Sequence, residues 1–328
     1  MTAPLLEVRN LRVEFPNRHG TLVALDDISF DIAPGEILGV VGESGAGKSL
    51  TGSAIIGLLD PPGRVAAGEI RFDGRRIDNL PYEEMRKVRG RHIGAIFQDP
   101  LTSLNPLYTV GRQLTETIQT HLNVGNDAAR SRAIKLLEET GIQAAEQRID
   151  QYPHQFSGGM RQRVVIALAL AAEPRLIVAD EPTTALDVSI QAQIISLLKR
   201  LCKDHGAAVM LVTHDMGVIA ETCDRVAVMY AGRIAEIGPV RDVIHAPAHP
   251  YTVGLMGSIP AMDEDRVRLL QIDGAMPRLT AIPRGCAFNP RCPKVFERCH
   301  RERPDLAAAG ATRAACWLNV AVPGSAAA

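Results

Sequence analysis

Residues 37–50 read ILGVVGESGAGKSL, and this stretch decides the fold. Its first five residues are wholly apolar, which is typical of a strand buried on both faces of a parallel sheet. The next eight match the pattern G-x-x-x-x-G-K-[S/T], whose glycines let backbone N–H groups turn inward around phosphate oxygens. The helix predicted directly after them adds the positive end of its dipole. This predicted phosphate loop consists of Gly42, Glu43, Ser44, Gly45, Ala46, Gly47, Lys48 and Ser49.

Two side chains of the loop have separate expected roles. We expect Lys48 to reach the β- and γ-phosphates of a nucleotide and Ser49 to ligate Mg²⁺. A glycine-rich turn with a chance Gly-Lys-Ser is the alternative. The strand before the loop and the helix after it are the context that the motif requires, so they favour the phosphate loop.

A second apolar run, 176–179, ends at Asp180 and Glu181. A carboxylate at the carboxyl end of a parallel strand points into the crevice where ligands bind. Asp180 therefore suits Mg²⁺, directly or through water, and Glu181 suits the general base that activates the attacking water. Taken alone, the pair is better explained as the start of a solvated loop; the phosphate loop favours the catalytic interpretation.

Composition and charge exclude several classes of protein. The chain has 328 residues, of which 46% are hydrophobic, as in ordinary globular proteins, and 36 basic residues balance 37 acidic ones. This balance gives no overall attraction to nucleic acid, and no nucleic-acid partner is expected. No apolar run approaches the ~18 residues of a membrane helix, and the N-terminus lacks a secretory signal. We expect a cytosolic protein that reaches a membrane only through a partner.

The remaining patterns predict an α/β fold with three further parts. Alternating apolar and polar residues at 6–15 and 24–33 predict an N-terminal β-subdomain. Helical spacing predicts an inserted helical subdomain over about 101–160, and strands alternating with helices over 157–238 predict a mostly parallel sheet. One predicted helix buries a face made of Ala129, Ala133, Leu136 and Leu137, and we expect it to end at Gly141. We expect a later helix to begin at the N-cap Ser189 and to end at Gly206. A hairpin turn is expected at Ala231-Gly232.

Proline becomes dense after about residue 240, and long helices do not run through such sequence. We therefore divide the chain into a domain over 1–240 and an irregular C-terminal extension over 241–328.

Residues 156–163, FSGGMRQR, resemble the signature motif of ATP-binding-cassette ATPases. The resemblance continues in order along about residues 5–240, which implies a RecA-like core sheet with an antiparallel N-terminal β-subdomain. The matching positions are Phe15 as the aromatic that stacks on adenine, Gln98 as the Q-loop, Ala185-Leu186-Asp187 as the D-loop and His214 as the switch histidine. Taken singly, Gln98 and His214 are better explained as polar residues that close a strand.

The resemblance implies a mechanism that needs two subunits. Ser157, Gly158 and Gly159 offer N–H groups ahead of a helix, which makes a second anion site. In this family, each ATP lies between the phosphate loop of one subunit and the Ser-Gly-Gly of the other. The resemblance gives Gln98 contact with Mg²⁺ or water, His214 a hydrogen bond to the γ-phosphate, and Asp187 a place at the dimer interface.

Several segments resemble the dipeptide, oligopeptide and nickel importer branch, among them EPTTALDVSIQAQI, HPYTVGLMGSIP and GCAFNPRCPKVFERCHRERP. This branch implies two permease subunits, an extracytoplasmic solute-binding protein and a second ATPase subunit, either a different chain or a second copy. It places the chain peripherally on the cytoplasmic face of the inner membrane. The alternatives are an importer of nickel or another small solute, a soluble cassette ATPase of DNA repair or translation, and an assembly platform with weak hydrolysis.

Four of the six cysteines crowd the C-terminal part in the pattern C-x5-C-x6-C-x16-C: Cys286, Cys292, Cys299 and Cys316. Four thiolates suit zinc or an iron–sulfur cluster, and the absence of a tight C-x₂₋₄-C pair favours a [4Fe-4S] cluster. Zinc and free or paired thiols stay as alternatives. We expect a structural role for the metal. The surrounding basic residues either balance thiolate charge or form a solvated face: Arg284, Arg291, Lys294, Arg298, Arg301 and Arg303. We expect Cys202 to be a core residue, and Cys223 likewise has no evident partner.

Overall fold

An eight-stranded sheet forms the centre of the computed structural model, which describes residues 3–18, 20–184, 186–257 and 272–320. Its strand order is β11-β12-β10-β9-β3-β8-β7-β6. The strands are β3 Ile37–Val41, β6 Ile93–Ile96, β7 Leu176–Asp180, β8 Ala208–Val212, β9 Arg225–Tyr230, β10 Arg233–Pro239, β11 Ala307–Ala309 and β12 Thr312–Ala314.

The five strands from β9 to β6 all run parallel, which confirms the predicted parallel core. All residues of β3 and β8 are buried, as are the first four of β7. Helices cover both faces of such a sheet, so its strands need apolar side chains on both sides. Because the strands are parallel, their carboxyl ends meet at one edge, where the phosphate loop and Glu181 follow β3 and β7.

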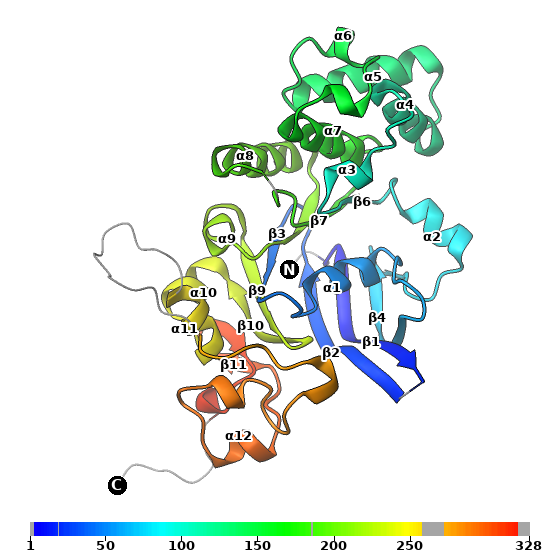
Figure 1. The fold of residues 1–328 in the computed structure, drawn as a ribbon. Coiled ribbons are helices and arrows are strands. Elements are labelled where there is room, and N and C mark those ends of the chain that lie inside the picture. Colours follow the sequence, from blue (N-terminus) through cyan, green and yellow to red (C-terminus); the bar gives the residue numbers. More distant parts are fainter. Residues whose placement is uncertain (1–2, 19, 185, 258–271, 321–328) are drawn as a thin grey trace.

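The N-terminal part forms a separate antiparallel sheet in the order β2-β1-β4-β5, as predicted. Its strands are β1 Leu6–Asn17, β2 Gly20–Ile32, β4 Arg64–Phe72 and β5 Arg75–Arg76. One hydrophobic core joins this sheet to α1 Lys48–Ile55, to α2 Tyr82–Val88 and to the central sheet. Figure 1 shows α1 between the two sheets.

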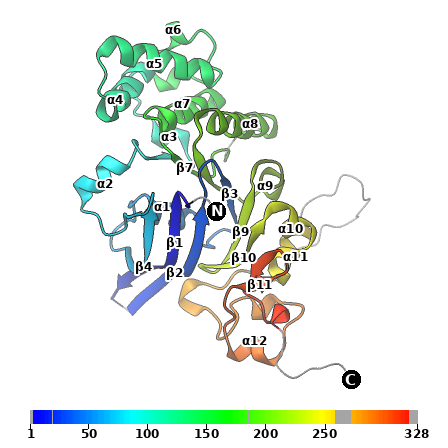
Figure 2. The ribbon, with the colours of Figure 1, turned by 180° about the vertical axis from the view of Figure 1, so that it is seen from behind.

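The inserted helices lie together at one end of the molecule (Figures 1 and 2), which confirms the helical subdomain. They are α3 Pro100–Ser103, α4 Val110–His121, α5 Asn126–Glu139, α6 Ala145–Arg148 and α7 Gly158–Leu170. The predicted face of α5 is buried, and Gly141 follows with a left-handed φ of 80°. The apolar face of α7 joins these helices to the central sheet.

One predicted helix start is wrong by two residues. α8 spans Val188–His205 with Asp187, not Ser189, at the N-cap position, and the Asp187 side chain makes no capping bond. The Gln191 amide instead donates to the carbonyls of Thr183 and Leu186, which fixes the turn before the helix. The Gly206 stop is confirmed, as is the hairpin turn, where Ala231 and Gly232 both have positive φ. Ala185 lies outside the described residues.

The C-terminal extension is more regular than proline density predicts. It contains α10 Val240–His245, α11 Pro250–Gly257, α12 Glu297–Arg301 and the strands β11 and β12. β12 pairs with β10, so the extension continues the central sheet. These three-residue strands are rich in alanine, and tertiary pairing rather than local propensity forms them. Residues 258–271 and 321–328 of the predicted extension lie outside the described residues. No described helix is both long and apolar enough to cross a membrane.

A buried carboxylate, Glu236 on β10, fastens the extension to the sheet. Its side chain is fully buried and accepts hydrogen bonds from the N–H groups of Ala248 and His249 and from the Thr312 hydroxyl, at 2.9, 3.0 and 3.0 Å. His249 is also buried, and burial lowers its pKa to about 4. Its Nδ1 accepts from the Tyr251 N–H, which orients the first turn of α11.

We predict that Glu236→Ala lowers the free energy of unfolding by about 2–4 kcal/mol, because it leaves two buried N–H groups without acceptors. Urea denaturation measures this loss. Glu83→Ala is the matched control, since its carboxylate is exposed and forms one surface ion pair; the expected cost there is below about 1 kcal/mol. Equal stability of both variants would contradict the anchoring role.

Candidate active site

The phosphate loop connects β3 to α1 in a conformation that only glycine tolerates at two positions. Gly42 has a φ of 151°, and a Cβ there would lie 2.2 Å from the carbonyl oxygen of Met229. Gly47 has a φ of 104°, and a Cβ there would lie 2.6 Å from Leu25. The glycines therefore let the loop pack against the β9–β10 hairpin and β2 while it turns into the helix.

Lys48, the first residue of α1, is 6% exposed, and its ammonium lies inside the loop. Nζ donates to the carbonyl oxygens of Gly42 and Glu43, at 2.8 and 3.2 Å. Burial lowers the pKa of Lys48, and the nearby carboxylates of Glu181 and Asp180 counteract this effect. The ammonium is thus held at the loop, where it can donate to phosphate oxygens.

Ser49 and Asp180 meet across the edge of the sheet, as the expected magnesium site requires. The Ser49 hydroxyl donates to Asp180 Oδ1 at 2.8 Å. Burial raises the pKa of Asp180, and the hydrogen bond from Ser49 lowers it. A hydroxyl and a carboxylate are hard oxygen donors of the kind that Mg²⁺ prefers, so these two residues fit the ion.

Glu181 is held at the carboxyl end of β7 by residues from three loops. Gln98 Nε2 donates to Glu181 Oε2 at 3.2 Å, and the Thr184 hydroxyl donates to the same oxygen at 2.9 Å. His214 Nδ1 lies 3.5 Å from Glu181 Oε1. The backbone of Glu181 has a left-handed φ of 45°, an uncommon conformation for a residue other than glycine that recurs at functional sites.

Lys48, Ser49 and Glu181 line one cleft of about 670 Å³. Most of its wall was predicted from the sequence: Ser44, Gly45, Gly47, Lys48, Ser49, Gln98, Glu181 and His214. Ala24, Leu50 and Leu279 complete it. Leu279 belongs to a short turn of the C-terminal extension, and nothing in the local sequence around it indicated this position. Thr184 was missed too, although its spacing three residues after Glu181 is a signal.

Other predicted residues do not line this cleft. The ring of Phe15 lies against Gly63, where a Cβ would be 2.6 Å from its Cε1 atom, so adenine stacking by Phe15 stays a prediction. Ser157 occupies the N-cap of α7 and accepts from the Met160 N–H at 3.4 Å. Gly159 of the same motif lies against Ile190 of α8, and Asp187 precedes that helix.

The four C-terminal cysteines line one small pocket of the extension. Burial, with smaller contributions from the other three sulfurs, raises the pKa of Cys286 to about 11. Burial also raises the pKa of Cys292 and of Cys316. None of the cysteines is in a disulfide. As the side chains stand, no three His, Cys, Asp or Glu groups in the described part of the chain are arranged to hold a metal ion.

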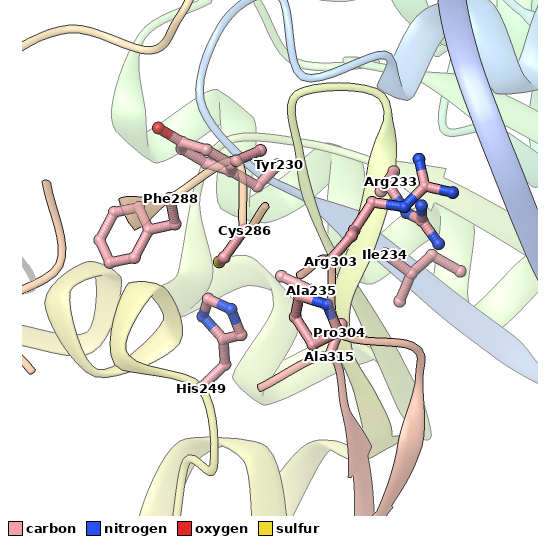
Figure 3. Close-up of a pocket in the computed structure, with 11 residues that line it drawn as sticks. Tyr230, Arg233, Ile234, Ala235, His249, Cys286, Phe288, Arg303, Pro304 and Ala315 are labelled. Carbon is pink, nitrogen blue, oxygen red and sulfur yellow. The ribbon is translucent and has the colours of Figure 1, made fainter. Parts of the chain in front are cut away.

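Figure 3 shows the pocket next to these cysteines, between the extension and the β9–β10 hairpin. The Cys286 side chain lies beside the rings of His249 and Phe288, and these three residues line both pockets. The ring of His249 contacts that of Phe288, and the Phe288 ring also contacts those of Tyr230 and Tyr251, so the wall of the cysteine pocket is continuous with a cluster of four aromatic rings.

The basic residues around the cysteines are mostly engaged elsewhere. Lys294 lines the cysteine pocket, and its charge lowers the pKa of Cys292 against the effect of burial. Arg291 pairs with Glu43, Arg298 stacks on Trp317, and Arg301 and Arg303 pair with Glu297 and Asp26. Among the contacts described here for these basic residues, only that of Lys294 can balance the charge of a cysteine thiolate.

Cys202 and Cys223 lie far along the chain from this pocket, and both contribute to the hydrophobic cores, as expected. Burial raises the pKa of each thiol to about 12. Neither thiol is therefore suited to ionise near neutral pH.

Two families match this chain. Residues 25–184 match the family described as ABC transporter, and residues 235–299 match the family described as oligopeptide/dipeptide transporter, C-terminal region. The first match includes the phosphate loop and Glu181; the second includes Glu236, Tyr251 and three of the four clustered cysteines.

Relatives and solved structures agree with these matches. The chain is 46% identical to the oligopeptide transport ATP-binding protein OppD of Salmonella typhimurium, over 96% of this chain and 94% of that protein. It is 48% identical to the dipeptide transport ATP-binding protein DppD of Bacillus subtilis, over 96% and 95%. A dimeric post-hydrolysis structure of the ATP-binding cassette MJ0796, bound to ADP and Pi, superposes with a TM-score of 0.65 at 30% identity, over 72% of this chain and 99% of that chain.

A second solved structure, cbiO1 from Clostridium perfringens, is part of the ABC transporter complex cbiONQ. It superposes with a TM-score of 0.64 at 30% identity, over 75% of this chain and 92% of that chain. With these similarities, the chain belongs to the ATP-binding-cassette ATPases, in the branch of the ATP-binding subunits of oligopeptide and dipeptide transporters.

Proposed function

We propose that this chain hydrolyses ATP at the cleft between α1 and β7 to drive the uptake of oligopeptides or dipeptides through membrane partners. The observation that carries the proposal is the meeting of Lys48, Ser49, Asp180, Glu181 and His214 at one cleft. ATP and Mg²⁺ are the cofactors that membership of the family implies. The peptide substrate is proposed from the names of the relatives and from the match of the extension.

The contacts at this cleft support a specific role for each residue. The loop N–H groups and Lys48 bind the phosphates, while Ser49, Asp180 and Gln98 would hold Mg²⁺, which would neutralise phosphate charge there. Glu181 takes a proton from the attacking water, and Gln98 and Thr184 hold its carboxylate in place for this task. We assign His214 the role of donating to the γ-phosphate, and its position 3.5 Å from Glu181 supports this role.

We propose that Ser157, Gly158, Gly159 and Asp187 act on the nucleotide of a partner cassette. They do not line the cleft of their own chain, and the Ser157–Gly159 N–H groups open a thirteen-residue helix, α7. An N-terminus of this kind favours an anion. The partner is a second cassette, either a different chain or another copy of this one.

The proposed assembly also contains two transmembrane permeases and an extracytoplasmic solute-binding protein. The chain then works at the cytoplasmic face of the plasma membrane, as a peripheral subunit. The residues of the ATP site do not distinguish this function from an importer of nickel or another small solute of the same branch. Transport assays with reconstituted permeases therefore distinguish the solutes.

We further propose that Cys286, Cys292, Cys299 and Cys316 hold a [4Fe-4S] cluster. Four thiols that share one pocket support it, because bound iron would stabilise the thiolate form against the burial that raises the pKa of Cys286. When bound, the cluster would cross-link a segment that has little core of its own.

We predict that Glu181→Gln lowers the ATPase rate about 10²–10⁴-fold while ATP binding persists, because the amide cannot accept the proton. The measurement is phosphate release by the assembled transporter with the partner site disabled. Glu173→Gln is the control, since this exposed carboxylate pairs with Arg132 away from the cleft. Survival of hydrolysis in the Glu181 variant would refute the base assignment and favour a platform role.

We predict that Leu279→Ala raises the Kd for ATP about three- to ten-fold, because it removes apolar surface from the wall of the cleft. Fluorescence titration with a labelled nucleotide measures it. Ile282→Ala lies in the same segment, is 40% exposed and does not line the cleft, so we expect no change there. Identical affinity in both variants would remove Leu279 from the site.

We predict that protein purified without oxygen contains about four iron and four sulfide per chain and absorbs visible light. Cys292→Ser should lose iron, while Cys223→Ser, outside the pocket, should retain it. Stoichiometric zinc, or full retention of iron in the Cys292 variant, would contradict the cluster. Free thiols with no metal would contradict it as well.

A further inference from the structure

The second residue of the phosphate loop, Glu43, forms an ion pair with Arg291 of the C-terminal extension. Nη1 of Arg291 donates to both oxygens of the Glu43 carboxylate, at 3.1 and 3.0 Å. The Arg291 side chain is only 6% exposed and the Glu43 side chain is 28% exposed, so this pair is shielded from water more than a surface ion pair. The two residues are 248 positions apart in the chain.

The guanidinium of Arg291 is fixed by its other contacts. Nε donates to the carbonyl oxygen of Asp273 at 2.9 Å, and Nη2 donates to that of Ile272 at 3.3 Å. Nη1 also lies 3.4 Å from the hydroxyl of Tyr230. Backbone carbonyls and the buried Tyr230 thus orient the guanidinium, so its contact with Glu43 has one geometry.

The same loop residue is held a second time, through its backbone. The Glu43 N–H donates to the hydroxyl of Tyr251 on α11 at 2.9 Å. Tyr251 is completely buried, and its ring packs edge-on against Tyr230 with centroids 4.7 Å apart. Burial raises the pKa of Tyr251, so the hydroxyl stays protonated and remains a neutral acceptor for this N–H.

The backbone of Glu43 also contacts the phosphate-binding lysine, Lys48. The carbonyl oxygen of Glu43 accepts from Lys48 Nζ at 3.2 Å and from the Ala46 N–H at 3.1 Å. Any shift of Glu43 therefore changes where the Lys48 ammonium rests. Met276 of the extension reaches the loop as well, and would lie 3.1 Å from a Cβ at Gly45.

We propose that Arg291 is a positioning residue for the ATP site: through Glu43 it holds the phosphate loop and Lys48 in the conformation that binds phosphate. The C-terminal extension is then part of the nucleotide-binding apparatus. Arg291 directly precedes Cys292, whose thiol lines the cysteine pocket, so the order of that pocket bears on the loop. The proposal rests on the proposed role of Gly42–Ser49 in binding ATP.

The test compares Arg291→Met with the full-length wild type in the assembled transporter. Without the guanidinium the loop samples other conformations, and apparent affinity falls with the population of the competent one, by about ten-fold. KM for ATP should rise by this factor while kcat at saturating ATP stays within about two-fold, because bound phosphates then hold the loop themselves. Arg291→Lys should recover part of the affinity, since its ammonium can pair with Glu43 but cannot reach all the acceptors.

Arg298→Met is the matched control. Arg298 belongs to the same cysteine-containing unit, where it stacks on Trp317 and pairs with Glu302, and it makes no described contact with the phosphate loop. We expect its KM for ATP to equal that of the wild type. Equal increases in the Arg291 and Arg298 variants would mean general loosening of the extension and would overturn the proposal.

If Arg291→Met does not fold, a substitution of its partner in the phosphate loop tests the same proposal. Glu43→Gln leaves the guanidinium and its carbonyl contacts in place and should raise KM in the same direction, and Arg291→Lys/Glu43→Gln should add little to either single change. Wild-type KM in Arg291→Met, or in Glu43→Gln, overturns the proposal. Failure of the wild type to bind ATP would instead defeat the proposed function.

Discussion

Parallel pairing of β6, β7, β8 and β3 is the constraint on which the site depends. All four strands end at the same edge of the sheet, and the segment after each strand contributes one group to the cleft. These groups are Gln98 after β6, Glu181 after β7, His214 after β8 and the phosphate loop after β3. Because these strands are largely buried on both faces and closely packed, a slip in register would disrupt the fit of their side chains to the surrounding residues. The core thus fixes the distances between polar groups that come from distant parts of the sequence.

The extension joins this site through a short chain of polar contacts. Glu236 fastens α11 and β12 to the sheet, α11 presents Tyr251 to the phosphate loop, and Arg291 reaches Glu43 from the cysteine-containing segment. Glu236, Tyr251 and Thr312 are buried, while the side chains of Arg291 and Glu43 are 6% and 28% exposed. Each of these groups has a hydrogen-bond or ion-pair partner. Buried polar groups specify one arrangement more strictly than apolar contacts do, because every alternative leaves a donor or acceptor unpaired.

The sequence predicted most of the central fold and most of the cleft, for physical reasons. Apolar runs of five residues identify doubly buried strands, and the loop motif is local, so Lys48 and Ser49 could be placed without tertiary information. The meeting of Ser49 with Asp180 followed from strand polarity. What could not be predicted depends on contacts between distant segments: Leu279 in the cleft, Arg291 on Glu43, and β12 beside β10. For Phe15, the order of motifs along the chain was not enough to predict a position, because its ring does not line the cleft.

The addition of β12 and β11 changes the rim of the central sheet. A strand at a sheet edge exposes unpaired N–H and C=O groups that invite pairing with another molecule. The seven residues of β10 would present such a template, but β12 pairs with it, and the outermost strands, β11 and β6, are only three and four residues long. The tail that steadies the ATP site therefore also shields the sheet against intermolecular aggregation.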